Sequence, residues 1–360
     1  MDKVEPSLPL VSVIIPSYNH ESYITECLKS VYEQDYTNFE VIIRDDGSTD
    51  NSPSIIQSFI MNADNTNNIS SVLEFGTNIG LVKSFNWLIN NSKGDIIIIC
   101  ASDDVFLPHR IKVAVEMHKN YSHVDLIASN AIVIATNGEI IRQSFYDMSK
   151  RKPFNNNEEA YVYISLPYKE ALSVGFGGFG MSFKRDLLRS VDYKLPESLL
   201  FEDGFLAFLA AIQNGIVLLK RPWLKYRRSE NNISHLDQSL DEKTILGNEK
   251  SFFTMLLSLE MNKLQYLITN LEVNSEINKY KFNSINFIKQ RIIILKVKLS
   301  VIDYSKCWKL WFELFWLLFK RPLYRETVKI LILCISRKAL LKYIILGYRN
   351  RASRFQRHDK

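Results

Sequence analysis

The chain has 360 residues, 46% of them hydrophobic, which is enough for one large domain or two smaller ones. The four cysteines, Cys27, Cys100, Cys307 and Cys334, are too far apart for a disulfide framework or a zinc-binding pattern, which favours a reducing compartment. Residues 1–9 do not predict a signal peptide, and no window has the roughly 18 uninterrupted apolar residues of a membrane-spanning helix.

Short apolar runs and helical segments alternate through the first hundred residues. The run 10–15 predicts a strand that Pro16 stops, and residues 21–34 have the apolar spacing of a helix. The elements predicted after these are a strand at 39–43, a helix after Pro53, a strand at 72–75, a helix at 80–90 and a strand at 96–101. Strands that alternate with helices over short connections predict βαβ units and a largely parallel sheet.

Two pairs of adjacent carboxylates follow strands of this predicted sheet. Asp45 and Asp46 follow the second strand, and Asp103 and Asp104 follow the fourth. The carboxyl ends of parallel strands lie at one edge of an open α/β sheet, where ligands bind, so both pairs can face one crevice. Like charges brought together repel unless a cation or hydrogen-bond donors compensate them. Each pair alone is more typical of an acidic turn, but the two together favour a divalent cation such as Mg²⁺, which binds carboxylates and substrate phosphates.

An ordered set of motifs resembles the family 2 glycosyltransferases, which have the GT-A fold. The matching segments are 11–19 (VSVIIPSYN), 45–50 (DDGSTD), 78–80 (NIG), 94–95 (GD) leading to 102–104 (SDD), 202–203 (ED), and 226–227 (YR) with 232–234 (NIS). The resemblance implies an α/β fold with a Rossmann-like, mostly parallel central sheet flanked by helices. It also implies inverting transfer of a sugar from a nucleotide diphosphate donor to an acceptor hydroxyl.

The resemblance further implies a donor site at the ends of the first, second and fourth strands. Its expected members are Pro16 and Tyr18 at the nucleotide, Asp46 with Asp45 at the base, Asp103 at the ribose or sugar, and Asp104 at a Mn²⁺ or Mg²⁺ ion on the diphosphate. An ionised Asp suits a base edge that presents an N–H, because it only accepts hydrogen bonds. The chain has no Gly-rich phosphate loop with a lysine, so a metal at Asp104 is the expected means of neutralising the diphosphate.

A third acidic pair, Glu202 and Asp203, precedes an apolar helix predicted at 206–212. The resemblance places the general base at Asp203, which would take the acceptor proton while the diphosphate leaves from the opposite face of the sugar. Glu202 is the second choice as base and could orient the acceptor. The alternative for Asp203 is a structural carboxylate favoured by the dipole at a helix N-terminus.

The chain departs from the family pattern after Tyr226 and Arg227. Many relatives have a histidine two residues after this pair, whereas the first histidine here is His235. Arg227 or Arg228 could bind the diphosphate instead, or His235 could swing in, and these alternatives stay open. No Gln-x-x-Arg-Trp run appears, which argues against a processive polymer synthase.

The net charge of +6 is unevenly distributed. Residues 291–360 contain 17 Lys/Arg and 4 Asp/Glu, a net +13, which leaves −7 for the first 290 residues. Residues 308–321 are dense in Trp, Phe and Leu, and 328–346 are apolar with interspersed cations, as in helices that lie in a membrane interface. A helical subdomain packed on the core is the alternative. No nucleic-acid-binding motif accompanies the basic end, so a nucleic-acid partner is not expected.

These patterns predict a catalytic domain at residues 1–240 and a helical extension at 241–360. Residues from about 10 to 110 would bind the nucleotide sugar, and residues from about 111 to 240 the acceptor. The expected function is transfer of one sugar from a UDP-, dTDP- or GDP-sugar to a lipid-linked or surface-polysaccharide acceptor of the O-antigen or capsule type. The expected place is the inner face of the plasma membrane. A non-catalytic scaffold that binds sugar nucleotides and a sugar nucleotidyltransferase are the alternatives, and the second would need a Gly-rich loop at 16–19.

Overall fold

The structure is a computed structural model that describes residues 8–67, 69–146, 155–156, 160–163, 180–228, 241–270 and 341–350, together with separate helical residues between 285 and 299. The chain forms two compact units. The first is Met1–Glu197 with Phe201–Ser229, and the second is Ser198–Leu200 with Glu230–Lys360.

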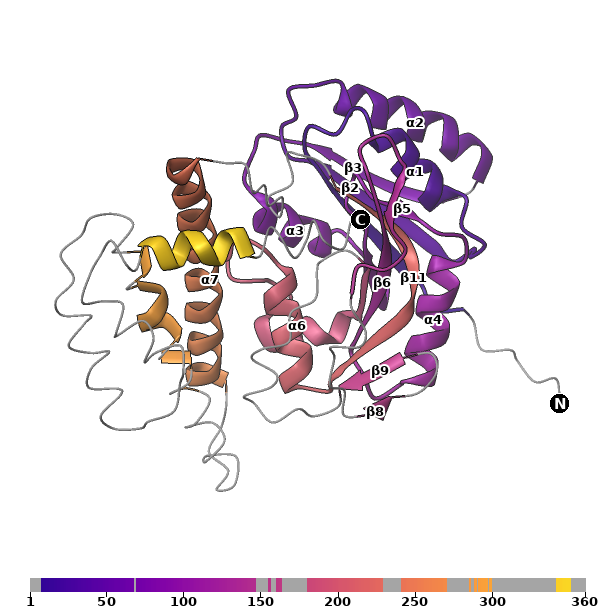
Figure 1. Cartoon of the computed structure of the whole chain (residues 1–360). Helices are drawn as coiled ribbons and strands as arrows, with labels where there is room; N and C mark the ends of the chain where they lie inside the picture. The colour runs from indigo at the N-terminus through magenta and orange to yellow at the C-terminus, as the bar shows by residue number, and fades with distance from the viewer. Residues whose placement is uncertain are drawn as a thin grey trace. The chain divides into compact units, whose positions relative to one another are not determined.

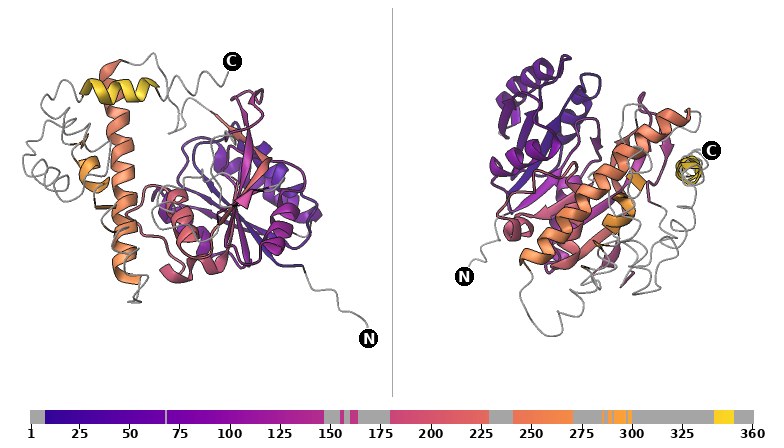
Figure 2. Two further views of the ribbon diagram at one scale, coloured as in Figure 1. Left: turned by 60° about the horizontal axis from the view of Figure 1, so that its bottom comes forward. Right: turned by 90° about the vertical axis from the view of Figure 1, so that its left-hand side faces the viewer.

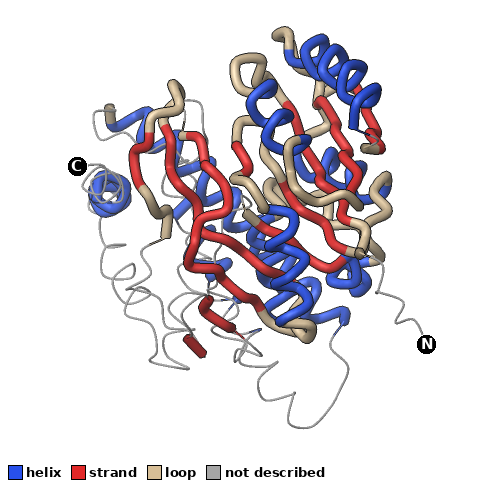
Figure 3. The backbone as a smooth tube through the Cα atoms, turned by 90° about the vertical axis from the view of Figure 1, so that its right-hand side faces the viewer, coloured by secondary structure: helices blue, strands red, loops and turns tan. Residues whose placement is uncertain are grey.

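The first unit is an eleven-stranded sheet with helices on both faces (Figures 1 and 3). The strands are β1 (Val11–Ser17), β2 (Phe39–Asp45), β3 (Ser70–Phe75), β4 (Ile96–Ile99), β5 (Val105–Phe106), β6 (Leu126–Ile134), β7 (Ile140–Arg142), β8 (Asn155–Asn156), β9 (Ala160–Tyr163), β10 (Met181–Lys184) and β11 (Ile216–Arg227). Helices α1 (Ile24–Tyr32), α2 (Ser52–Asn67) and α4 (Arg110–Asn120) cover one face. Helices α3 (Leu81–Asn90) and α6 (Asp203–Ile212) cover the other, and a 3₁₀ segment spans Arg185–Val191.

The sheet has the order β3-β2-β1-β4-β10-β6-β11-β9-β8, with β5 paired to β11 and β7 to β6. The first four strands are parallel, as predicted: Val11 pairs with Phe39 on β2 and with Ile96 on β4. Beyond β4 the pattern changes, because β10 runs antiparallel to both of its neighbours and β11 runs parallel to β6. The predicted α/β fold is therefore confirmed, but its sheet is mixed rather than mostly parallel.

The residues of the parallel half explain why these strands form. All four isoleucines of β4 are buried, and β1 and β2 are buried along nearly their whole length, as in strands covered on both faces. Pro16 does not end β1 as predicted, since the strand continues to Ser17. Pro16 lies beyond the last pair that β1 makes with β4, at Ile14, so its missing N–H leaves that ladder intact.

The second unit contains α7 (Glu242–Asn270), and residues 341–350 form a short helix that lies across it (Figure 2). Phe253 of α7 packs with Leu295 and Ile344 in a small apolar cluster. Among the described residues, no helix has the length and apolar character needed to cross a membrane. The aromatic segment 308–321 and His235 lie outside the described residues.

Candidate active site

Both predicted acidic pairs lie at the same edge of the sheet. Asp45 is the last residue of β2, and Asp103 and Asp104 follow β4. Strand β1 runs parallel to and between these two strands, so the carboxyl ends of all three meet at one edge. The prediction that the pairs share an edge is confirmed.

The first pair fixes the turn that leaves β2. Asp45 accepts hydrogen bonds from the Ser48 backbone N–H (2.8 Å), from the Ser48 hydroxyl (2.7 Å) and from the Ser17 hydroxyl (3.2 Å). Gly47 has φ +79°, and a Cβ atom there would lie 2.8 Å from the backbone nitrogen of Asn78. The turn therefore requires glycine, both for its backbone conformation and for its close approach to the segment before α3.

Asp46 joins this turn to the start of α3. Its carboxylate accepts the backbone N–H groups of Ile79 and Gly80, each at 2.9 Å, and pairs with Arg44 at 2.5 Å. The Asn78-Ile79-Gly80 motif thus supplies main-chain donors to an acid of the preceding motif. Because Asp45 and Asp46 both have several protein donors, recognition of a base by either one stays a prediction.

The second pair is buried and electrostatically unfavourable. Asp104 is 1% exposed, and Asp103 is also buried. Burial raises the pKa of Asp104 well above its ordinary value, and the charge of Asp103 raises it further, against a lowering contribution from Arg227. Burial also raises the pKa of Asp103, which is opposed by His20 and Arg227. His20 bonds through Nδ1 to the Ser102 hydroxyl (2.7 Å), and its Nε2 lies 4.0 Å from Asp103 Oδ2.

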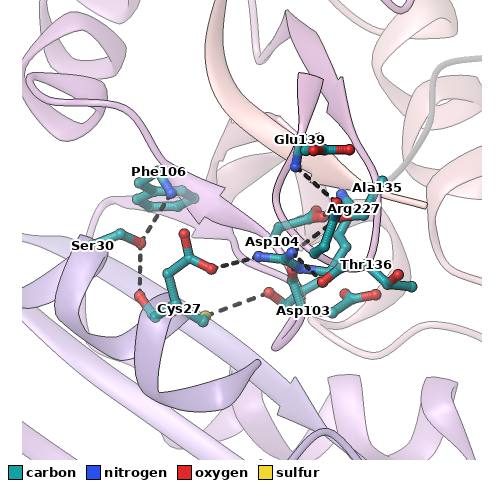
Figure 4. Close-up of polar contacts among 12 residues, drawn as sticks. Cys27, Ser30, Asp103, Asp104, Phe106, Ala135, Thr136, Glu139 and Arg227 are labelled. Atoms are coloured by element: carbon teal, nitrogen blue, oxygen red, sulfur yellow. Dashed lines mark hydrogen bonds and ion pairs between the residues drawn. The ribbon is translucent and has the colours of Figure 1, made fainter. Parts of the chain in front are cut away.

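Arg227, at the end of β11, bonds directly to this second pair (Figure 4). Its backbone N–H donates to Asp104 Oδ1 at 3.0 Å, and its Nε donates to the Asp103 carbonyl at 3.0 Å. The side chain is itself buried, at 2% exposure. One residue of β11 therefore fixes both the backbone and a carboxylate of the acidic turn.

The remaining donors of the Arg227 guanidinium also bond to protein acceptors. Nη1 donates to the carbonyls of Ala135 and Thr136, at 3.1 Å each, in the turn that follows β6 (Figure 4). Nη2 donates to Glu26 of α1 at 2.5 Å, and the guanidinium lies 4.8 Å from the centre of the Tyr23 ring. These contacts hold Arg227 as a link between α1, β11 and the acidic turn, and its predicted contact with a diphosphate stays a prediction.

One atom of the pair Asp103 and Asp104 indicates that a divalent cation could bind there. Asp104 Oδ2 is buried and has no hydrogen-bond partner, although a buried carboxylate oxygen without a partner costs free energy. A hard cation accepts such an oxygen as a ligand and completes its shell with water and phosphate oxygens. The described residues contain no group of three or more His, Cys, Asp or Glu that could hold a metal by themselves. Such an ion would be held through Asp104 Oδ2.

The third acidic pair lies at the start of α6, as predicted. Asp203 is the first residue of the helix, and its Oδ1 accepts the N–H of Gly204 at 2.5 Å. Glu202 is buried, and its Oε2 has no hydrogen-bond partner. Burial, followed by the charge of Asp203, raises the pKa of Glu202 to about 7. The pair thus contains one carboxyl that titrates near neutral pH beside the predicted base.

Comparison with known proteins assigns the domain. Residues 12–189 match the glycosyl transferase family 2. They form a family 2 glycosyltransferase domain. Glycosyltransferase GlyG of Streptococcus pneumoniae is 38% identical over 103 residues, which cover 29% of this chain and 33% of that protein. An uncharacterized glycosyltransferase of a Nostoc species is 32% identical over 126 residues, 33% of this chain and 38% of the relative.

The chain spans about a third of the length of these two curated relatives. Its fold is similar to that of S. aureus TarS residues 1–349 in complex with UDP, with a TM-score of 0.52. The two are 18% identical over 96% of this chain and 91% of the TarS chain, which shows a common fold.

The family 2 domain contains site residues that the motif analysis did not single out. His20, Tyr23 and Glu26 all face the acidic turn or Arg227, and none of them is among the predicted site residues. Their spacing of three residues is a signal that one face of this segment is used, because residues three apart lie on the same side of a helical turn. Tyr18, the first residue after β1, is 46% exposed and so remains available to line a nucleotide pocket with Pro16.

Proposed function

We propose that this protein is an inverting, metal-dependent glycosyltransferase that uses a nucleotide diphosphate sugar. The observation that carries the proposal is the buried Asp104, whose Oδ2 has no protein partner and lies at the carboxyl edge of the parallel strands. The family 2 domain supports the reaction class. S. aureus TarS, which has the same fold, is known in complex with UDP and with UDP-GlcNAc, and this supports a nucleotide-sugar donor.

The donor side of the proposal has a division of roles. Tyr18 and Pro16 would line the nucleotide pocket, with Asp46 near the base and Asp103 near the ribose or sugar. Asp104 would hold Mn²⁺ or Mg²⁺, which when bound neutralises the charge of the leaving diphosphate. The burial that makes Asp104 costly in the free protein would strengthen its attraction to a cation, since charges interact more strongly away from water.

The acceptor side needs a single displacement. The acceptor hydroxyl oxygen forms a bond to the anomeric carbon as the bond from that carbon to the diphosphate breaks. Asp203 would take the hydroxyl proton, and the nucleoside diphosphate leaves with the electron pair of the broken bond. Glu202 is buried beside Asp203, so its protonation state would influence the electrostatic environment of Asp203.

The class of acceptor and the cellular location of the protein are further parts of the proposal. We place the acceptor among lipid-linked or surface-polysaccharide saccharides of the O-antigen or capsule type. We place the protein at the inner face of the plasma membrane, where the basic, aromatic segment within 291–360 would contact anionic lipid. Loss of binding to anionic liposomes on truncation after residue 300 is the expected result, and unchanged binding would contradict the membrane proposal.

The experiment that tests the activity is nucleotide release and nucleotide binding with a panel of UDP-, GDP- and dTDP-sugars, with Mn²⁺ or with EDTA. The variant is Asp104→Ala, and its matched control is Asp186→Ala, an exposed aspartate whose ion pair is with Arg189. We expect one donor to bind and to release its nucleotide slowly in Mn²⁺, with both effects lost in EDTA and in Asp104→Ala but kept in the control. Failure of every donor to bind would overturn the proposal, and binding without metal or Asp104 dependence would remove Asp104 from the site.

A further inference from the structure

Three residues in α1 and in the segment just before it have side chains that face the acidic turn or Arg227. They follow one another at intervals of three residues, and each makes a different contact. His20 bonds to Ser102, Tyr23 lies under the Arg227 guanidinium, and Glu26 accepts from Arg227 Nη2. The first helix of the fold therefore presents one face to the acidic turn.

Glu26 is the acidic member of this set, and it forms an ion pair with a buried partner. It is 201 residues from Arg227, and its side chain is 52% exposed whereas that of Arg227 is 2% exposed. The other acceptors described for the guanidinium, at Nε and Nη1, are neutral backbone carbonyls. Glu26 thus adds a directly hydrogen-bonded negative charge to a buried guanidinium that is also attracted by Asp103 and Asp104.

The position of Arg227 in turn decides how Asp104 is held. The backbone N–H of Arg227 occupies Asp104 Oδ1, and the side chain fixes the Asp103 carbonyl one residue earlier. This arrangement leaves Oδ2 of Asp104 as the oxygen without a partner. A shift of Arg227 would release Oδ1 and let the carboxylate rotate, so both oxygens would lose their defined positions.

We propose that Glu26 is a positioning residue of the donor site. Its ion pair with Arg227 keeps Asp104 bonded through one oxygen and ready to bind, through the other, the cation of a metal–nucleoside diphosphate complex. This inference rests on the proposed function. It goes beyond it by assigning a role to an exposed glutamate on a helix that holds none of the predicted donor-site residues.

The test uses the full-length protein with Glu26→Gln, which keeps the shape and removes the charge, and Glu26→Asp, which keeps the charge. Glu33→Gln is the matched control, since Glu33 is an exposed glutamate at the other end of the same helix. The first readout is hydrogen exchange of the Arg227 amide in metal-free protein, which reports directly on its bond to Asp104 Oδ1. The second is binding of UDP, GDP and dTDP by calorimetry, with Mn²⁺ and with EDTA.

For Glu26→Gln we expect exchange at the Arg227 amide to rise roughly threefold to tenfold, the range for losing a charge-assisted bond at a half-exposed site. Mn²⁺-dependent nucleotide binding should weaken by a similar factor, while binding in EDTA stays as in the parent. Glu26→Asp should recover part of both losses, and Glu33→Gln should match the parent.

The two levels of the inference fail in different ways. If the parent protein binds no nucleoside diphosphate with Mn²⁺, the proposed function fails and this role of Glu26 fails with it. If the parent binds but Glu26→Gln exchanges and binds like the parent, only the role of Glu26 is overturned. Equal effects of Glu26→Gln and Glu33→Gln would also overturn it, because they would mean that any change on α1 disturbs the site.

Discussion

Replacement of Asp104 by asparagine should stabilise the free protein while it abolishes metal-dependent donor binding. Asp104 is 1% exposed, and its Oδ2 has no partner. A buried polar group without a partner costs about 1–3 kcal/mol, and a charged one costs more. Asparagine keeps an oxygen for the Arg227 N–H and removes the charge. A gain of about 1 kcal/mol in the free energy of unfolding is therefore expected, and it corresponds to a rise of about 2–4 °C in Tm for a domain of this size.

The raised pKa of Asp104 gives this gain a definite pH dependence. Between the ordinary value of 3.8 and the raised value, the folded protein holds a proton that the unfolded chain has released. The stability of the parent therefore falls as the pH rises through this window. Asparagine does not titrate, so the Tm advantage of Asp104→Asn should be small at acid pH and greatest above the raised pKa.

Thermal melts of both proteins in EDTA, across this pH range, measure the effect on stability, and calorimetry with nucleoside diphosphate and Mn²⁺ measures the effect on binding. Asp186→Asn serves as the control, because its exposed carboxylate should change neither quantity. A Tm that is no higher than that of the parent at the highest pH tested would refute the reasoning from burial. Unchanged Mn²⁺-dependent affinity would refute the assignment of Asp104 to the metal.

Three further substitutions have defined outcomes. Asp203→Asn should bind donor in calorimetry like the parent but lose transfer in a product assay, and equal loss of both would indicate a structural role. Glu202 has a pKa raised from 4.5 to about 7. The parent should therefore lose stability relative to Glu202→Gln as the pH rises through that interval. A difference in Tm between the two proteins that does not change with pH would contradict this. A Cβ atom on Gly94 would lie 2.5 Å from the Ser12 backbone nitrogen. Gly94→Ala should therefore lower the free energy of unfolding, measured by denaturant titration, by about 1–3 kcal/mol. A stability equal to the parent's would show that β1 can shift at no cost.

The parallel half of the sheet could be predicted because its signals are local. Buried strands such as Ile96–Ile99 are short runs of β-branched residues, and the helices between them have clear apolar spacing. The place of β10 could not be predicted, since Met181–Lys184 is a short run whose pairing with β4 depends on residues more than 80 positions earlier. Pro16 was misjudged because the effect of its missing N–H depends on which neighbour ends first, and sequence alone does not give that.

Part of the candidate site could likewise be predicted from the sequence, and part of it could not. The shared edge of the two acidic pairs follows from strand direction, so it could be inferred without coordinates. The contacts of Arg227 could not be inferred in this way. Glu26 on α1 is 201 residues away from it, and the described acceptors of Nε and Nη1 are main-chain carbonyls, which have no signature in the sequence. The burial of Glu202 could not be predicted either, because the residue lies in a short polar stretch before an apolar helix.

The position of β10 has a consequence for the order in which the chain can fold during synthesis. Strands β3, β2, β1 and β4 are complete by Ile99, and they can pair as soon as they leave the ribosome. The far edge of β4 then stays open until Met181–Lys184 has been made, and Arg227 is added still later. An exposed apolar strand edge is a template for aggregation. The nascent protein must therefore protect the β4 edge while about 80 further residues are translated, and its acidic turn gains its final support only near the end of the first unit.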